Sequence, residues 1–395
     1  MNLKRRTIES HAVFGVLAVL LLSGMTWHGH AQGTLYSIGQ PTGEEQLYLE
    51  HINRSRANPT AEGVRLAGVT DPDVLAAYAY FGVNLAMMTN RFATNPPVPP
   101  LAFNAKLIDA ARWHSGDMFA NRYQSHSQTN GGVIRDPGQR LTYDGYSWTT
   151  WGENVFSAAK NVSYGHAAFN VDWGSGPGGM INPPGHRNNI HNGNFREVGI
   201  GVFNGVNGPV GPQLVTQDFA TQPGATPFIT GVVYSDLDGD NSYGLGEGVG
   251  GVTVAVDKSP YYAISANSGG YAVPVTTNGN YTVIFSGAGF SSNTVSVGIT
   301  NQRNAKIDFV PVYSPPVIEL ANRPTISGGQ IQIDFIVGNY RSGMIFQLWT
   351  AFDPAGPWSL DTSAAISTIT PSTAFRATAQ TGSAASVFYR IKGSY

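Results

Sequence analysis

Pro184-Gly185-His186-Arg187-Asn188-Asn189-Ile190 is the stretch that decides the fold of this chain. Upstream of it lie Gly152-Glu153-Asn154 and the polar turn Ser125-His126-Ser127. Two imidazoles and one carboxylate therefore stand within about sixty residues, at positions that no apolar stripe explains. Apart from three in the first 31 residues, all the histidines lie between His51 and His191. Any imidazole chemistry is therefore expected in this part of the chain.

The residues around these motifs show the periodicity of helices and short strands. Thr42-x-x-Glu45 is a capping-box pattern, which predicts the start of a helix. Further helices are predicted from Asn104 to about Tyr123 and from Tyr164 to Trp173. The stretches Glu197–Phe203 and Gln213–Phe219 alternate as a pair of antiparallel strands. The pattern indicates an α+β fold, with helices packed on a small antiparallel sheet.

His114 differs from His126 in its setting. It shares the buried stripe of the second predicted helix with Leu107, Ala111 and Met118, at spacings of three and four. A core histidine hydrogen-bonded to the backbone is favoured there over a ligand. His126 follows the helix in a polar turn, so a core role does not explain it.

The three motifs, in this order and spacing, resemble the CAP superfamily, also called the SCP-like extracellular domain, in its bacterial form. The match continues through Glu197-Val198-Gly199-Ile200-Gly201 and Thr216-Gln217-Asp218-Phe219, over roughly 180 residues. The resemblance implies an α-β-α sandwich in which two histidines and acidic residues line an open cleft. Asn58 to Pro100 departs from the family pattern as an insertion, and is expected to form an extra helix beside the cleft.

The family often carries a tetrad of two His and two Glu. The resemblance maps three of its members onto His126, Glu153 and His186. The fourth has no clear counterpart, and Asp172, beside Trp173, is the nearest candidate. This departure means that the resemblance fixes no catalytic scheme.

Two neutral imidazoles with one or two carboxylates suit Zn²⁺ or a similar divalent ion, with positions left open for water or ligand. Such a site lowers the pKa of bound water toward about 7, and Glu153 is then a candidate general base. Glu153 is equally suited to accept hydrogen bonds from loop amides. The sequence lacks His-Glu-x-x-His, Gly-x-Ser-x-Gly and cysteine. Asn154 and Arg187 are expected to brace the cleft.

An acidic loop further along the chain has side-chain oxygens at its positions 1, 3, 5, 7 and 12, on Asp236, Asp238, Asp240, Ser242 and Glu247. In EF-hand loops, oxygens at these positions bind Ca²⁺. Here strands, Thr230–Tyr234 and Val252–Val256, are predicted on either side. The combination resembles the calcium-binding B-type repeat of bacterial surface adhesins, a β-sandwich. The alternative is a solvated acidic turn.

Composition divides the chain into three folded regions. The last one alternates as antiparallel strands and resembles the fibronectin-III-like modules of secreted bacterial proteins. Its Trp349 and Trp358 are expected in the core rather than as a carbohydrate platform. With linkers at 222–227 and 314–316, the expected regions are a CAP/SCP-like domain at 34–225, a calcium-binding β-sandwich at 228–312, and a C-terminal β-sandwich at 316–395.

The pattern of residues 1–31 predicts a secretory signal peptide. Basic residues at 4–6 precede the apolar run Ala12–Met25, and small residues precede a cleavage site before Gln32. A membrane anchor is the alternative, but this run is shorter than the about 20 residues that span a bilayer. The formal net charge is −2 and no basic stripe occurs, which argues against a nucleic-acid partner. Cysteine is absent, so the exported protein folds without disulfides.

Three functions fit these observations. The first is a secreted binding protein whose cleft captures a lipid, wall or surface component. The second is a metal-dependent extracellular hydrolase of peptidase or esterase type, and the third is a structural or adhesive surface protein. The combination of His126, Glu153 and His186 favours the first two, and the lack of a nucleophile favours the first. The protein is expected outside the cell or on its surface, with no transmembrane anchor after signal cleavage.

Overall fold

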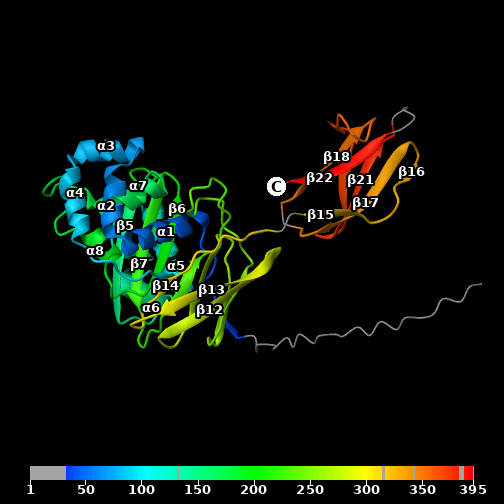
Figure 1. Cartoon of the computed structure of the whole chain (residues 1–395). Helices are drawn as coiled ribbons and strands as arrows, with labels where there is room; N and C mark the ends of the chain where they lie inside the picture. The colour runs from blue at the N-terminus through cyan, green and yellow to red at the C-terminus, as the bar shows by residue number, and fades with distance from the viewer. Residues whose placement is uncertain (1–32, 131–132, 314–315, 341–342, 382–386, 395) are drawn as a thin grey trace, which may run out of the picture. The chain divides into compact units, whose positions relative to one another are not determined.

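The computed structural model describes residues 33–130, 133–313, 316–340, 343–381 and 387–394 (Figure 1). The predicted signal peptide at 1–31 lies outside the described residues. Within the described residues, no helix is long and apolar enough to cross a membrane.

Residues 43–221 combine helices with a four-stranded sheet. The helices are α1 (Gly43–Ala57), α2 (Pro59–Ala67), α3 (Pro72–Phe81), α4 (Leu85–Ala93), α5 (Ala105–Asn121), α6 (Pro137–Tyr143), α7 (Val162–Ala167), the π-helix η1 (Ala168–Asp172) and α8 (Gly185–Ile190). The sheet has the order β2 (Ala102–Phe103), β6 (Glu197–Asn204), β7 (Gln213–Thr221) and β5 (Thr150–Ala159), antiparallel except for the β2–β6 pair. A separate hairpin joins β3 (Gln128–Asn130) to β4 (Val133–Arg135).

The helix starts follow the capping residues. Thr42 accepts a hydrogen bond from the Glu45 amide at 3.2 Å, and the Glu45 carboxylate accepts one from the Thr42 amide at 2.8 Å, which confirms the predicted capping box. Asn104 caps α5, so the predicted helix there is confirmed. The insertion 58–100 is helical as expected, but it forms three helices where one was expected, because Asn58, Asp71 and Asn84 each cap a new one.

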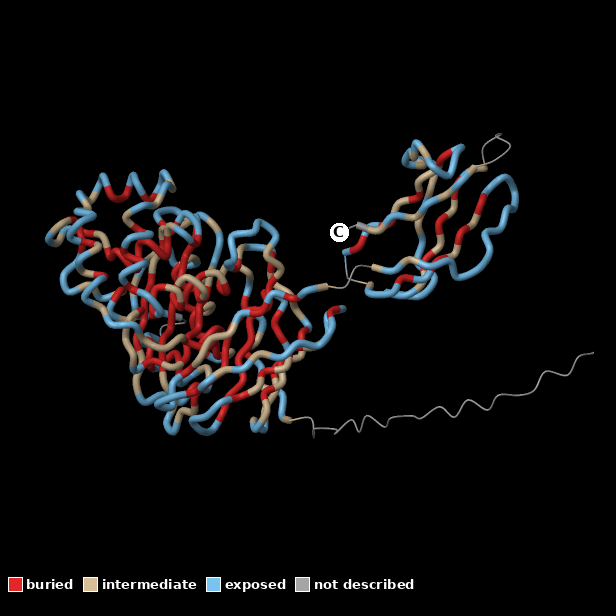
Figure 2. Tube along the Cα trace, in the orientation of Figure 1, coloured by how far each residue is buried: buried red, intermediate tan, exposed pale blue. Residues whose placement is uncertain are grey.

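Alternate residues of strand β6 point to opposite faces of the sheet, and helices cover both faces. Val198 and Ile200 point into the apolar cluster that contains residues of α1. Gly199 and Gly201 face the other way, and a Cβ at either would collide with the backbone of α5. Helix α5 therefore lies directly on the sheet. Figure 2 shows the buried residues concentrated along these strands and the helices that face them.

In the part of the chain after residue 227 that the structure describes, the regular elements are all strands. One sheet has the order β1 (Thr34–Leu35), β10 (Tyr261–Ile264), β9 (Thr253–Val256), β12 (Gly279–Gly287) and β13 (Phe290–Ile299). The other has the order β11 (Gly270–Pro274), β8 (Phe228–Val232) and β14 (Ala305–Lys306). The acidic loop lies between β8 and β9, so strands flank it as predicted.

This strand region and the helical region share a core. Phe228 and Ala272 belong to the same apolar cluster as Tyr48 and Leu49 of α1. Lys306 Nζ lies 2.7 Å from a carboxylate oxygen of Glu50, also on α1. In addition, Thr34 and Leu35, assigned from sequence to the first region, pair with β10 of the second. The segment 222–227 therefore joins two bodies that pack on each other.

The C-terminal region contains two further sheets. Their strands are β15 (Val317–Leu320), β16 (Thr325–Ser327), β17 (Gln330–Gly338), β18 (Ile345–Ala351), β19 (Ser359–Leu360), β20 (Ala365–Thr370), β21 (Ala374–Gln380) and β22 (Phe388–Ser394). The orders are β15-β17-β21-β20, with β16 also paired to β17, and β19-β18-β22. The sandwich arrangement of the two strand regions stays a prediction.

The expectation that Trp349 and Trp358 lie in the C-terminal core was wrong. Both are half-buried and lie outside the apolar cluster around Phe335. Lys392 Nζ is 3.7 Å from the ring centre of Trp349, and the Arg390 guanidinium is 4.3 Å from that of Trp358. The long cationic side chains cover the indoles, because cation–π contact stabilises such pairs at a surface.

Candidate functional site: the histidine cleft

His126 and Glu153 meet at the start of strand β5. The Nδ1 atom of His126 lies 2.7 Å from Glu153 Oε1. An ionised carboxylate only accepts hydrogen bonds, so Nδ1 carries the hydrogen and Nε2 keeps its lone pair. The Glu153 side chain is 1 % exposed, whereas that of His126 is 57 % exposed. The carboxylate is therefore a buried anchor, and the imidazole is the group that solvent or a ligand can reach.

Arg140, on α6, completes this half of the site. It donates to the second oxygen of Glu153 and, at 2.7 Å, to the backbone carbonyl of His126. Its side chain is fully buried, and burial lowers its pKa while Asp218 opposes that change. No sequence motif pointed to Arg140. The only local signal is the Asp136–Gln139 capping box, which fixes where α6 begins.

His186 and Asp172 form a second pair of the same design. His186 Nδ1 lies 2.9 Å from Asp172 Oδ1, and the His186 backbone N–H donates to Asp172 Oδ2 at 3.0 Å. Asp172 ends the π-helix with a φ of 54° and is buried, while the His186 side chain is 33 % exposed. The candidate fourth acidic residue therefore does reach the site. The helix predicted over Tyr164–Trp173 is present as α7 and η1.

The two pairs lie close enough for the charge of one to act on the other. Burial lowers the pKa of His126, and the nearby charges of His186 and Arg140 lower it further. Asn154 donates to the His186 carbonyl at 3.2 Å and to Gln217 Oε1 at 3.0 Å. The expectation that Asn154 braces the cleft is therefore confirmed.

Asn189 strengthens the same frame, although sequence reasoning had assigned it no role. It donates to the Glu153 carbonyl at 3.0 Å and to Asn154 Oδ1 at 2.9 Å. Arg187 contributes differently from what was expected. Its buried guanidinium lies 5.1 Å from the ring centre of Phe92, so it packs against α4.

The chemistry of the cleft follows from these bonds. Each imidazole has its Nδ1 held by a buried carboxylate, which is how proteins orient a histidine that binds through Nε2. Both oxygens of Glu153 are engaged, and both oxygens of Asp172 are engaged. Both carboxylates are also buried, so solvent reaches the imidazoles rather than the carboxylates. Glu153 therefore orients His126 in this structure, and its role as a general base stays a prediction.

His114 has the role favoured for it from sequence. It is completely buried, and its Nε2 lies 2.7 Å from the Ser125 carbonyl. Burial, with the charge of Arg140 in the same direction, lowers its pKa to about 3. It is thus a neutral core histidine that holds the turn in front of His126.

The acidic loop brings together part of its predicted ligand set. The carboxylates of Asp236, Asp238 and Asp240 lie within 4.8 Å of one another. Ser242 Oγ donates to Asp240 at 2.7 Å. Glu247 is buried and does not join the aspartates: its two oxygens accept from the amides of Leu237 and Gly244, at 2.8 and 2.6 Å.

Comparison with known proteins supports the assignment of the first region. A family model described as CAP, the cysteine-rich secretory protein family, matches residues 50–219. This chain contains no cysteine. The matched range includes His126, Glu153, Asp172 and His186. Residues 50–219 are therefore a CAP domain.

Solved structures show weaker likenesses. An extracellular protein containing an SCP domain, from Bacillus anthracis str. Ames, is 23 % identical over 39 % of this chain and 45 % of its own, with a TM-score of 0.25. This chain thus spans less than half of that protein. A DUF3823 family protein from Bacteroides ovatus is 14 % identical over 43 % of this chain and 90 % of its own, with a TM-score of 0.19. A search of curated proteins found no match to this chain.

Proposed function

We propose that this protein is secreted and that its CAP cleft binds a divalent metal ion and captures an extracellular ligand, a lipid or a wall or surface component. The observation that supports this most is the pair of Nδ1–carboxylate contacts, His126 with Glu153 and His186 with Asp172. Both contacts leave Nε2 free on rings that solvent reaches.

The residues of the cleft fit a weakly held metal better than a structural one. His126 and His186 would supply two nitrogen ligands, while Glu153 and Asp172 stay behind them as hydrogen-bond acceptors. Among the described residues, no group of three His, Cys, Asp or Glu converges in the cleft. Water or an oxygen of the ligand would therefore complete the coordination shell, and a bound Zn²⁺ would polarise that oxygen.

A binding role is preferred over hydrolysis. A hydrolase needs a group that can take a proton from water. Both cleft carboxylates are already engaged with His126, His186 and Arg140, and the proposed metal ion would occupy the free Nε2 atoms of the two histidines. The extracellular hydrolase stays the alternative function, and an adhesive surface protein the second alternative. Secretion is proposed from the predicted signal peptide together with the CAP domain. In the acidic loop we propose a Ca²⁺ ion held by Asp236, Asp238 and Asp240.

Metal titration of the mature full-length chain tests the cleft. Zn²⁺, Mg²⁺ and Ca²⁺ are titrated calorimetrically into wild type, into His126→Ala/His186→Ala, and into Asp236→Asn/Asp238→Asn. We expect one Zn²⁺ site that only the histidine variant loses, and one Ca²⁺ site that only the aspartate variant loses. Circular dichroism confirms that each variant is folded. Undiminished Zn²⁺ binding by the histidine variant would show that the cleft is not the metal site.

A further inference from the structure

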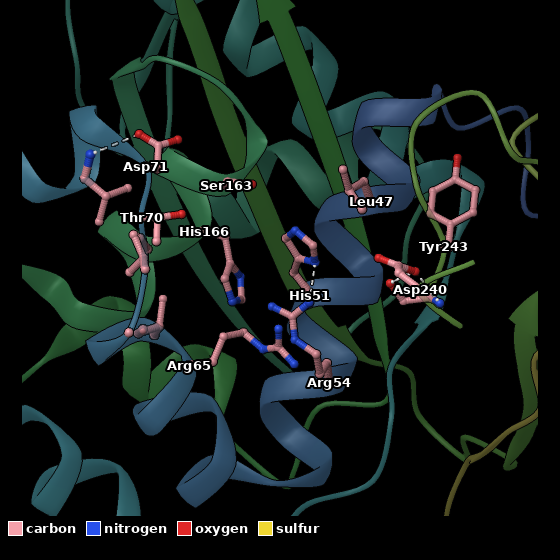
Figure 3. Close-up of a pocket in the computed structure, with 16 residues that line it drawn as sticks. Leu47, His51, Arg54, Arg65, Thr70, Asp71, Ser163, His166, Asp240 and Tyr243 are labelled. Carbon is pink, nitrogen blue, oxygen red and sulfur yellow. Dashed lines mark hydrogen bonds between the residues drawn. The ribbon is translucent and has the colours of Figure 1, made fainter. Parts of the chain in front are cut away.

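A second pocket, of about 500 Å³, lies outside the cleft (Figure 3). Helices α1 and α2, the connection between α2 and α3, helix α7 and the 236–247 loop supply its walls. Neither histidine of the cleft lines it. Its polar groups include His51, Arg54 and Arg65, and the carboxylates of Asp71 and Asp240 also line it.

Arg54 fixes the hydrogen on His51. Its Nη1 lies 3.0 Å from His51 Nδ1, and a guanidinium can only donate, so Nδ1 is the acceptor. Burial, with the charges of His166 and Arg54, lowers the pKa of His51 well below its ordinary value, and the ring is neutral. The hydrogen must then be on Nε2. His51 therefore has a single N–H donor, on Nε2, and this atom does not contact Arg54.

The two arginines share one carboxylate. Glu62 is buried and accepts from Arg54 at 2.8 and 3.0 Å, and Arg65 Nε lies 3.4 Å from the same group. His166 Nε2 lies 2.9 Å from Glu62 as well, and burial lowers its pKa, so it adds no charge. Two positive charges thus face one negative charge, and the Arg65 side chain is 59 % exposed. Among the residues that the structure describes, the only ion pair of Arg65 is the 3.4 Å contact with Glu62, and the charge of Asp240 acts on it as well.

The other charges of the pocket are the carboxylates of Asp71 and Asp240, and hydrogen bonds from Ser242, together with the charge of Arg65, lower the pKa of Asp240. Asp71 caps α3 by accepting from the Asp73 amide at 2.9 Å, and Asp240 accepts from Ser242 at 2.7 Å. Figure 3 shows both carboxylates away from the Arg54 and Arg65 guanidinium groups. They are acceptors that hydroxyl groups can donate to. A metal ion is unsuited to the wall itself, because the two guanidinium groups repel a cation.

We propose that this pocket binds a small ligand with one oxyanion, a carboxylate or a phosphate, on a hydroxyl-bearing body of about the size of a sugar. The oxyanion takes hydrogen bonds from Arg65 and from the outer N–H groups of Arg54, while His51 Nε2–H, which points away from Arg54, donates to a hydroxyl oxygen of the ligand body. Guanidinium groups suit this role because their planar N–H groups match the oxygens of a carboxylate or phosphate. The hydroxyl groups of the ligand donate to Asp71 and Asp240.

The test is titration of the mature full-length protein with D-glucuronate, glucose 6-phosphate and D-glucose. Calorimetry gives the affinities, and the NMR signal of the His51 ring reports the location. We expect saturable binding of at least one charged sugar, with a shift of the His51 Nε2–H signal. Arg65→Gln, a change at an exposed side chain, should weaken that binding by about tenfold or more. Arg323→Gln, at an exposed position in the C-terminal region, is the matched control and should bind as wild type does.

The comparison between the two charged sugars identifies the oxyanion, because the tighter one carries the preferred group. Three results would overturn the proposal: no saturable binding of either charged sugar, equal binding of D-glucose, or unchanged binding by Arg65→Gln. His51→Phe keeps a ring in place and removes the donor. It should also weaken binding, and wild-type affinity in that variant would exclude His51 from the site.

Discussion

Asp172 contacts His186 twice: Oδ1 lies 2.9 Å from the ring Nδ1, and Oδ2 accepts the His186 backbone N–H at 3.0 Å. One buried carboxylate therefore fixes both the ring and the first turn of α8. Glu153 orients His126 in the same way, with Arg140 behind it. Both imidazoles are thus held by groups that a ligand does not reach, which lowers the entropy lost on binding.

Removal of the Asp172 carboxylate should loosen His186. We expect Asp172→Ala to weaken Zn²⁺ binding by about 10–100-fold, the usual effect of removing a residue that orients a metal ligand. Asp172→Asn should weaken Zn²⁺ binding less than Asp172→Ala does. It keeps one acceptor, and asparagine tolerates the positive φ of 54° at this position. Calorimetric Zn²⁺ titration measures both variants, and equal affinities for wild type and Asp172→Ala would refute the orienting role.

Arg140 should be essential for stability. Arg140→Gln leaves Glu153 as a buried, poorly compensated charge, and we expect a loss of about 3–5 kcal/mol in the free energy of unfolding. Urea denaturation measures the loss. In Arg140→Gln/Glu153→Gln the uncompensated charge is gone, so most of the stability should return. The control is Lys160→Gln, at an exposed position, with no change expected. A double variant as unstable as the single one would argue against an electrostatic cause.

Asp218 should make stability depend on pH. It is completely buried, neither of its oxygens has a hydrogen-bond partner among the residues that the structure describes, and burial raises its pKa to about 7 despite Arg140. A carboxyl whose pKa is raised by folding is most favourable when protonated, so its contribution is lost as the pH rises through about 7. Asp218→Asn stays neutral. Its stability relative to wild type should therefore increase between pH 6 and pH 8 in urea denaturation, and a constant difference would contradict this assignment.

The glycines of β6 should not tolerate a side chain. Gly201→Ala puts a Cβ against the backbone of Ala111 and Arg112 in α5, and overpacking of this kind costs about 1–3 kcal/mol. Gly185→Ala, at the start of α8, has no atom near the added Cβ and serves as the control. Thermal denaturation should show a lower melting temperature for the first variant only. Equal melting temperatures would mean that α5 can shift away from the sheet.

Calcium should stabilise the protein through the acidic loop. A ligand present at about 100 times its Kd adds about 2.7 kcal/mol to the free energy of unfolding. We expect Ca²⁺ to raise the melting temperature of wild type and to leave that of Asp236→Asn/Asp238→Asn unchanged, as followed by calorimetry. A rise of equal size in the variant would place calcium elsewhere.

The sequence predicted several of the helices and some of the residues that pair in the cleft. The capping box at Thr42 and the stripe on α5 depend on residues that are close together in the sequence, which a single chain displays. His126, Glu153 and His186 are far apart in the sequence, and their grouping was expected from the resemblance to the CAP superfamily. Arg140 was missed because its contact with Glu153 depends on how α6 packs against β5, and no pattern of residues records that. The shared core was missed for the same reason: Phe228 follows a linker-like segment, and only packing shows that it lies against α1.

That shared core has a consequence for proteolysis. Pro223 and Gly224 are exposed, so the connecting segment is open to cleavage. A protease that cuts there would leave the two pieces joined by the buried contacts of α1, the Glu50–Lys306 ion pair and the β1–β10 pairing. The nicked protein should elute as a single species in native buffer and separate into two fragments only in denaturant. A cut between the two regions would therefore not release the CAP domain from the strands that follow it.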